Sequence, residues 1–323
     1  MSYSEQQHFL IQKLKEMAEE LGRLPTSGDF KKRFPNINVT ILFGSHDNFL
    51  RGAGLKEPLP EPKIKYRQPK ILVFDIETKP IKAWVWGLFD QNVGLEQIIE
   101  DWSVLSWAAK WIGNDEVLYQ DLSQHKDHNN DEIIIYGIWE LLNEADIVVT
   151  QNGKKFDVKK LNTKFAQYKL GPPSKYKHID TLQIKKKNFG LTSNKLAYST
   201  NKFNDRYKKL EHGKFPGMKL WIECLKGNQE AWAEMKEYNI HDVLALEELY
   251  VNHLMKWDNT INYGVYTGEK GCCPNCGKTN LIDFGYSYTK NTANQQLKCK
   301  DCGTISTSKD NELPKALTKS FLK

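Results

Sequence analysis

The sequence predicts a mixed α/β sheet flanked by helices, with a small helical module before it and a metal-binding module after it. The sheet is predicted because strand-like runs come first and helices then alternate with strands. The first run, ILVFD at 71–75, is long and apolar enough to be buried on both faces. Further strands are expected at 104–110, 116–121 and 146–150, and helices at 131–143, 156–168 and 229–255, the last with a break near Tyr238.

The composition excludes a membrane protein and argues against a secreted one. Charged residues make up 27% of the 323 residues, and the mean hydropathy is −0.60. No run of eighteen apolar residues occurs, and the first residues include acidic side chains where a secretory signal would be basic and then apolar. We therefore expect a cytoplasmic protein with no membrane partner.

Composition also divides the chain into segments. Residues 1–55 are expected to form a helical module, because Leu10, Leu14, Met17 and Leu21 recur at helical spacing and Gly22 can end that helix. Residues 56–69 are rich in proline and are expected to form a stiff linker. The main α/β domain is assigned to 70–257, and short strands around cysteine pairs to 264–323.

Charge is concentrated in one part of the main domain. Residues 151–226 contain nineteen Lys or Arg and five Asp or Glu, a net charge of +14, whereas the rest of the chain sums to −8. A basic segment inside a folded domain favours a polyanionic partner such as nucleic acid. The alternative is a solvated surface without a partner.

Carboxylates recur where the predicted elements would bring them together. Asp75 and Glu77 are two residues apart at the end of a strand, so both side chains lie on one face. Asp157 follows a buried strand and a glycine turn, where it would begin the next helix. Tyr238 and Asp242 are four residues apart, which places them on one side of a helix.

Such a set of oxygen ligands suits two hard divalent cations, Mg²⁺ or Mn²⁺. Two ions about 4 Å apart can stabilise the attacking and the leaving oxygen of an in-line phosphoryl displacement. The chemistry to expect is therefore phosphodiester hydrolysis. Each motif taken alone also has an ordinary explanation: a solvated loop for Asp75 and Glu77, a helix cap for Asp157, and a surface pair for Tyr238 and Asp242.

The order of the three motifs, FDIET, NGKKFD and YNIHD, resembles the DEDD superfamily of 3′–5′ exonucleases, which have a ribonuclease H-like fold. The resemblance covers about residues 70–255 and is to the tyrosine-bearing branch, because Glu237 stands where the other branch has histidine. It implies that Asp75, Glu77 and Asp242 hold one metal ion, that Asp75 and Asp157 hold the second, and that Tyr238 orients the attacking water.

Other segments of the sequence, including QNVGLEQIIEDW and VLSWAAKW, are similar to phage and prophage exonuclease-like proteins. This resemblance implies that the protein acts in a bacterial or phage-infected host cell. Trp84, Trp86 and Phe89 lie in an insert that the compact proofreading domains lack. These rings could stack on the bases of a single strand, or they could belong to the core.

Lysines near the second motif could hold a phosphate backbone without reading sequence. Asp180 is expected to cap a helix and not to join the carboxylates. The candidate contacts of the main domain are Lys154, Lys155, Lys159, Lys160, Lys185, Lys186 and Lys187.

Two Cys-x-x-Cys knuckles, CPNCG and CKDCG, are separated by twenty-two residues near the end of the chain. Four thiolates at this spacing form a closed tetrahedral site, so the pattern predicts a zinc ribbon with one structural Zn²⁺ and no catalytic role. Cys272 could replace its neighbour, although the proline and glycine of the first knuckle favour the assigned set. The predicted ligands are Cys273, Cys276, Cys299 and Cys302.

The N-terminal residues, ending in FGSHDNFLRGAGL, resemble a single copy of the repeat associated with homing endonucleases, a proposed DNA-binding module. Residues 1–55 carry seven basic and six acidic side chains, so nonspecific attraction to phosphate would be weak. Lys31, Lys32 and Arg33 are the expected contact cluster. A purely structural helical cap is the alternative.

Together these features predict a metal-dependent nuclease that removes nucleotides from the 3′ end of single-stranded DNA. A structure-specific endonuclease and an RNA exonuclease are the alternatives within the same chemistry, because no feature of the sequence distinguishes the sugar. From a different class, a nonenzymatic nucleic-acid-binding adaptor would retain the carboxylates as a relic. Protein partners are not predicted.

Overall fold

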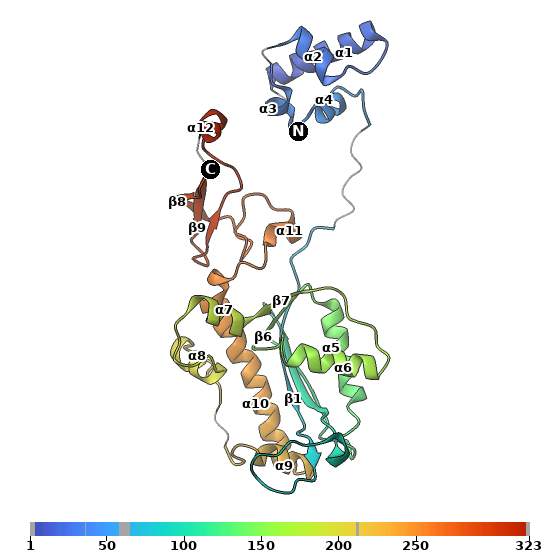
Figure 1. Ribbon diagram of the computed structural model, residues 1–323, viewed down its shortest axis with the longest axis vertical. Coiled ribbons are helices and arrows are strands. Elements are labelled where there is room, and N and C mark those ends of the chain that lie inside the picture. Colours follow the sequence, from blue (N-terminus) through green and yellow to red (C-terminus); the bar gives the residue numbers. More distant parts are fainter. Residues whose placement is uncertain (1–3, 36, 58–64, 211–212, 321–323) are drawn as a thin grey trace. The chain divides into compact units, whose positions relative to one another are not determined.

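The computed structural model describes residues 4–35, 37–57, 65–210 and 213–320 (Figure 1). The chain divides into two compact units, Met1–Lys65 and Tyr66–Lys323. Half of the predicted proline-rich linker, residues 58–64, lies outside the described residues. In the part that the structure describes, no helix combines the length and the apolar character that crossing a bilayer requires.

The first unit is a small helical module, and Gly22 ends its first helix as the sequence predicts. Ser4 and Thr26 cap the first two helices, and Gly22 ends the first in a left-handed conformation. Its core is made by apolar side chains such as Leu10, Phe30 and Phe49. The helices are α1 (Glu5–Leu21), α2 (Ser27–Arg33), α3 (Val39–Phe43) and α4 (His46–Gly52).

The second unit is built on a five-stranded mixed sheet with the order β5-β4-β1-β6-β7. The central strand β1 pairs antiparallel with β4 and parallel with β6, and β4–β5 and β6–β7 continue these directions. The sequence predicts four of these five strands; β7 was not predicted, because its KHID sequence is short and polar. The strands are β1 (Ile71–Thr78), β4 (Val104–Trp111), β5 (Val117–Asp121), β6 (Ile147–Thr150) and β7 (Lys177–Asp180).

Helices cover both faces of the sheet, as Figure 1 shows for α5 and α6 on one side of β1 and α10 on the other. One apolar cluster contains Leu72 and Phe74 from β1 with Ile135 and Phe165 from the first two helices. The other contains Val73 with residues such as Leu246 of the long helix. The helices are α5 (Glu132–Glu144), α6 (Asp157–Gln167) and α10 (Gln229–Glu248).

The predicted break near Tyr238 is wrong. Helix α10 runs without interruption through Tyr238, and the regular pattern changes only at Leu249, where a π-helical segment, η2 (Leu249–Leu254), and a short 3-10 turn, η3 (Met255–Trp257), follow. The uninterrupted helix keeps Tyr238 and Asp242 one turn apart on the same side.

Shorter helices lie along the chain between α6 and α10. Asp180 accepts a hydrogen bond from the Leu182 amide at 3.0 Å and caps α7, as predicted. These elements are α7 (Thr181–Asn188), α8 (Leu196–Phe203) and α9 (Lys219–Leu225).

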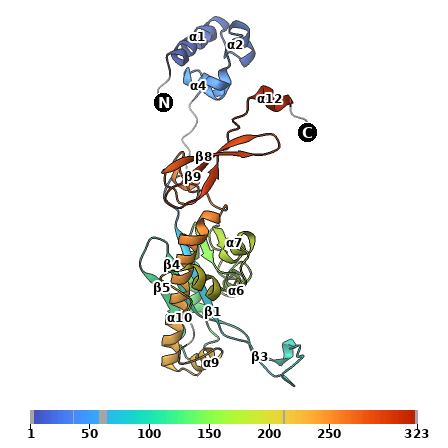
Figure 2. The ribbon, with the colours of Figure 1, turned by 90° about the vertical axis from the view of Figure 1, so that its left-hand side faces the viewer.

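A projecting segment lies between β1 and β4, and we call residues 81–100 the apolar arm. It contains a two-stranded pair and a 3-10 turn, and Figure 2 shows β3 within it, away from the sheet. Its elements are β2 (Lys82–Ala83), η1 (Leu95–Gln97) and β3 (Ile98–Glu100).

The last part of the chain forms a three-stranded antiparallel sheet, ordered β10-β9-β8, beside the cysteine knuckles. It is joined to the preceding domain by hydrogen bonds, including one of 2.7 Å from Asn275 Nδ2 to the Asp258 carbonyl. Its elements are α11 (Tyr263–Thr267), β8 (Leu281–Tyr288), β9 (Ala293–Cys299), β10 (Ile305–Thr307) and α12 (Lys315–Ser320).

Candidate active site

The first two carboxylates come from the end of β1. The strand is buried from Ile71 to Phe74 and half-buried at Asp75 and Glu77, which lie opposite Ala108 and Ser106 of β4. The apolar residues fix the strand between the two helical layers. Alternation along the strand then directs both carboxylates to the same face.

The third carboxylate comes from α10. Asp242 is buried, and one carboxylate oxygen from each of Asp75, Glu77 and Asp242 lies within 4.8 Å of the others. Two elements far apart in the sequence therefore contribute to one cluster. Helix α10 packs on β1 and so brings together residues that are far apart in the chain, such as Asp75 and Asn239, which are 164 residues apart.

Asp157 lies at the start of α6, where the sequence places it. The turn before it holds Asn152 in a left-handed conformation with φ 67°, and a Cβ on Gly153 would come within 2.2 Å of the Thr150 hydroxyl. Asp157 Oδ1 accepts a hydrogen bond of 3.3 Å from the amide of Ile76, the residue between Asp75 and Glu77. The fourth carboxylate is thus tied to the strand that carries the first two.

The charges of these groups oppose one another. Burial, and then the charges of Asp157, Glu77 and Asp242, raise the pKa of Asp75 well above its usual value. Burial and the charge of Asp242 raise the pKa of Glu77 to about 8, and burial raises the pKa of Asp157 to about 7. Carboxyl groups that resist ionisation in this way fit the binding of a divalent cation, because the cation would balance their negative charges.

Lys209 is part of the site and was not predicted. Its Nζ contacts the Asp242 carboxylate and lies 4.3 Å from the centre of the Tyr238 ring. Burial alone would lower the pKa of Lys209, but Asp242 and then Tyr238 more than offset it, so the pKa is raised. The residue comes from an irregular segment with no periodic pattern, and only its basic composition hinted at it.

Aromatic contacts hold Tyr238 in place. Its ring is buried and meets Trp221 of α9 edge to face, with 6.3 Å between the ring centres. A side-chain hydrogen bond also links Trp221 to Glu77. Burial, followed by the charge of Asp242, raises the pKa of Tyr238 to about 12, so its hydroxyl stays protonated at neutral pH.

The predicted lysine contacts divide into two groups. Lys154, Lys155, Lys159, Lys186 and Lys187 are exposed, whereas Lys160 is half-buried with its Nζ 3.7 Å from the centre of the Trp102 ring. For Lys185 the prediction of a phosphate contact is wrong. Its side chain is fully buried, and its Nζ donates to Ser199 Oγ at 2.7 Å and to the Asn194 carbonyl at 3.1 Å.

In the N-terminal unit, Lys31, Lys32 and Arg33 are exposed in the last turn of α2. Arg33 forms an ion pair with Glu20 of α1, and the second contact of this pair, from Nη2 to Oε1, is 3.2 Å. Part of this predicted cluster therefore links two helices of its own module.

The four predicted zinc ligands converge. The sulfur atoms of Cys273, Cys276, Cys299 and Cys302 all lie within 4.8 Å of one another, and this four-cysteine cluster is compatible with a zinc ribbon. Gly277 and Gly303 follow the second cysteine of each knuckle with φ of 74° and 78°. The Cys272 thiol instead donates to the Glu269 carbonyl at 3.3 Å, outside the cluster.

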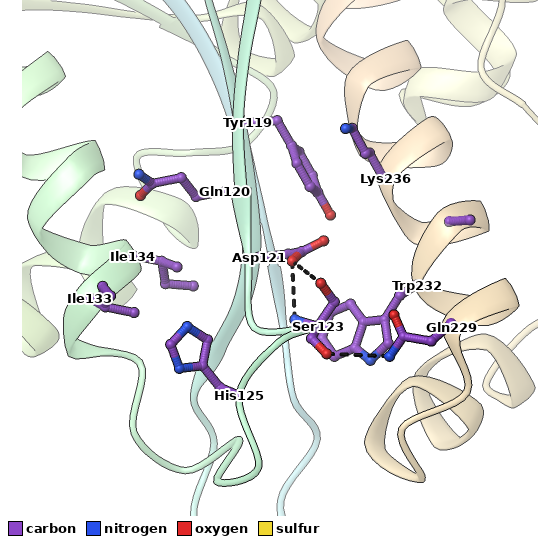
Figure 3. A pocket seen from close by; sticks show the side chains of 11 residues that line it. Tyr119, Gln120, Asp121, Ser123, His125, Ile133, Ile134, Gln229, Trp232 and Lys236 are labelled. Atoms are coloured by element: carbon purple, nitrogen blue, oxygen red, sulfur yellow. Dashed lines mark hydrogen bonds between the residues drawn. The ribbon is translucent and has the colours of Figure 1, made fainter.

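A cavity of about 470 Å³ lies between β5, α5 and α10. Figure 3 shows Tyr119 of β5 and Lys236 of α10 beside this cavity, and the Lys236 Nζ lies 5.5 Å from the centre of the Tyr119 ring. The cavity is lined by a different set of residues from the carboxylate cluster, so it is not the predicted site.

The apolar arm bears aromatic and aliphatic side chains that face solvent. Trp86 is 96% exposed, Phe89 83% and Trp84 74%. The interpretation of these three rings as core residues is therefore wrong, and stacking on bases stays a prediction. Lys79 anchors the base of the arm through a 2.9 Å ion pair with Glu100.

Comparisons with known proteins identify two segments. Residues 104–254 match the model of the RNase_H superfamily, so the α/β domain is ribonuclease H-like. Residues 5–56 match the model of the homing endonuclease associated repeat. No curated protein matches the chain.

A solved structure similar to this chain is the family B DNA polymerase of the hyperthermophilic archaeon Pyrobaculum calidifontis. The TM-score is 0.44 and the sequence identity is 14%, over 72% of this chain and 32% of that one. The chain thus spans about a third of the polymerase's length.

Proposed function

We propose that this protein is a metal-dependent nuclease that hydrolyses phosphodiester bonds by a two-metal mechanism. One observation carries the proposal: carboxylate oxygens of Asp75, Glu77 and Asp242 converge within 4.8 Å although they come from β1 and α10. The ribonuclease H-like match of residues 104–254 supports a nuclease. Four acidic groups kept together at the cost of mutual repulsion are best explained by cations that bind between them.

Each carboxylate has a distinct role in this proposal. Asp75, Glu77 and Asp242 would hold one ion, and Asp75 and Asp157 would help to hold a second. A bound pair of Mg²⁺ or Mn²⁺ ions supplies Lewis acidity to both the attacking and the leaving oxygen of an in-line displacement. The hydrogen bond from the Ile76 amide fixes the direction of Asp157 toward β1.

Tyr238 orients the attacking water in this proposal. Its hydroxyl remains protonated because the pKa is raised to about 12, so it acts through a hydrogen bond and not as a base. Lys209, beside both Tyr238 and Asp242, places a positive charge against the buried Asp242 carboxylate.

We further propose that the substrate is single-stranded DNA, cut from its 3′ end. The order of the motifs supports an exonuclease, and the exposed lysines beside Asp157 support contact with a phosphate backbone. The solvent-facing rings of the apolar arm support stacking on unpaired bases. The four-cysteine cluster holds one structural Zn²⁺, and the helical repeat is an additional nucleic-acid contact.

The test is incubation with single-stranded and duplex DNA and RNA, labelled at the 3′ or the 5′ end, with Mg²⁺ or Mn²⁺. The account predicts stepwise shortening of 5′-labelled single-stranded DNA, early release of the 3′ label, and no reaction when the divalent ion is left out. Tyr238→Phe should slow the reaction by on the order of 10²-fold, because only the hydroxyl is lost.

The matched control is Asp75→Ala, which should abolish hydrolysis while it leaves DNA affinity largely intact. Products cut at internal positions would indicate an endonuclease and not an exonuclease. Faster cutting of RNA than of DNA would indicate that RNA is the substrate. Binding without any hydrolysis under all conditions would contradict the nuclease and favour a nonenzymatic adaptor.

A further inference from the structure

A buried amide lies against the carboxylate that the proposed mechanism uses most. Asn239 is fully buried in α10, directly after Tyr238. Its Nδ2 donates to Asp75 Oδ2 at 3.1 Å and lies 3.5 Å from the Asp75 carbonyl oxygen. The side chain thus joins the long helix to the one strand residue assigned to both ions.

A second buried side chain fixes the direction of this amide. Ser106 of β4 is fully buried, and its hydroxyl donates to Asn239 Oδ1 at 3.1 Å. An asparagine whose carbonyl accepts this hydrogen bond keeps its NH₂ group on the opposite side, toward Asp75. The chain Ser106–Asn239–Asp75 therefore connects β4, α10 and β1.

The Asn239 amide is a suitable hydrogen-bond partner for a carboxylate that binds metal ions. A carboxylate offers about four acceptor positions on its two oxygens, and one N–H donor occupies only one of them. A neutral donor also leaves the negative charge of Asp75 available to cations, unlike the ammonium group of Lys209 beside Asp242. Donors of this kind orient metal ligands, and their loss typically weakens metal binding or activity by about 10- to 100-fold.

We propose that Asn239, held by Ser106, is a positioning residue that directs the Asp75 carboxylate toward the two metal ions. The inference rests on the proposed function, since it concerns the same site. Neither residue contacts the substrate in this proposal. Both act only through Asp75.

The test measures Mn²⁺ binding to the full chain without substrate, by electron paramagnetic resonance and by calorimetry. Asn239→Leu, which keeps the size of the side chain but removes the donor, should weaken Mn²⁺ binding by about 10- to 100-fold. Ser106→Ala should weaken it less, because the amide remains but is free to turn. The double variant should be no worse than Asn239→Leu, because the two residues act in series.

Two controls separate positioning from folding and from the nuclease proposal. Asn228→Ala removes the cap of the same helix, where its side chain accepts from the Glu230 amide at 3.0 Å; it should lower the melting temperature but leave Mn²⁺ affinity unchanged. Asp75→Ala identifies the Mn²⁺ that binds at the carboxylates.

The possible outcomes differ for the two proposals. Unchanged Mn²⁺ affinity in folded Asn239→Leu, with Asp75-dependent binding in the wild type, would overturn the positioning role alone. If Asn239→Leu does not fold, Ser106→Ala decides in its place, and unchanged affinity there overturns the role. A wild-type chain with no Asp75-dependent Mn²⁺ binding would overturn the proposed function and this inference with it.

Discussion

Single residues of the site show a conflict between charge and burial that a cation would relieve. Asp75, Glu77 and Asp157 all have pKa values above their ordinary range, chiefly because they are removed from water. Backbone amides and Lys209 compensate in part. Without a divalent ion, the folded state therefore binds protons that the unfolded chain has already lost at neutral pH.

This conflict predicts how stability depends on pH. A carboxyl group whose pKa is raised on folding destabilises the fold once the pH exceeds its unfolded value, so the cost increases from about pH 4.5 until Glu77 ionises near pH 8. The melting temperature of the magnesium-free protein should fall between pH 5 and pH 8, by roughly 2–4 °C per kcal/mol lost. Thermal denaturation followed by fluorescence measures it.

Mg²⁺ should raise the melting temperature more at pH 8 than at pH 6, because the protons no longer compete with the ion. The matched variant is Asp75→Asn, which removes one repelling charge. It should stabilise the magnesium-free protein at pH 8 and lose most of the stabilisation by Mg²⁺. A wild-type melting temperature that rises steadily to pH 8 without Mg²⁺ would contradict the buried repulsion.

Helix α6 and the turn before it carry both Asp157 and the exposed lysines for which we propose contact with a nucleic-acid backbone. The turn directs Asp157 toward β1, while Lys154, Lys155 and Lys159 on the same segment face solvent. Helix α7 contributes Lys186 and Lys187, and its buried Lys185 instead fastens the helix to residues 194–199. Burial lowers the pKa of Lys185 to about 8.

The exposed lysines predict the salt dependence of binding. Replacing Lys154, Lys155 and Lys159 by glutamine should reduce the slope of log K against log salt concentration by about 2, since each phosphate contact on a single strand contributes about 0.7. Fluorescence anisotropy with labelled single-stranded DNA measures the slope. Lys126 is exposed and lies outside the basic segment, so Lys126→Gln should leave the slope unchanged. Equal effects of Lys126→Gln and of the triple variant on the slope would indicate that the basic segment is a solvated surface.

The whole second unit shows what can be predicted from the sequence and what cannot. Apolar runs and the spacing of carboxylates and cysteines predicted the central strands, the converging acidic groups and the four-cysteine cluster. Lys209 and Asn239 were missed because their roles depend on contacts across long distances in sequence. Lys185 was misassigned because a buried lysine and its exposed neighbours, Lys186 and Lys187, look alike in a sequence.

Different parts of the chain contribute different kinds of contact in this account. The sheet and α10 hold the carboxylates, and the apolar arm presents rings to solvent. The four-cysteine cluster is built into the end of the second unit, where Asn275 bonds to the Asp258 carbonyl. The proposed nuclease activity depends on the four carboxylates more than on any of these other parts.

The most direct test is a crystal structure of the protein with Mn²⁺, in which anomalous scattering locates each ion. The account predicts two Mn²⁺ ions about 3.5–4 Å apart, both bound by Asp75, one also by Glu77 and Asp242 and the other near Asp157. Crystals soaked in Mn²⁺ that show no ion between Asp75 and Asp242 would contradict the account.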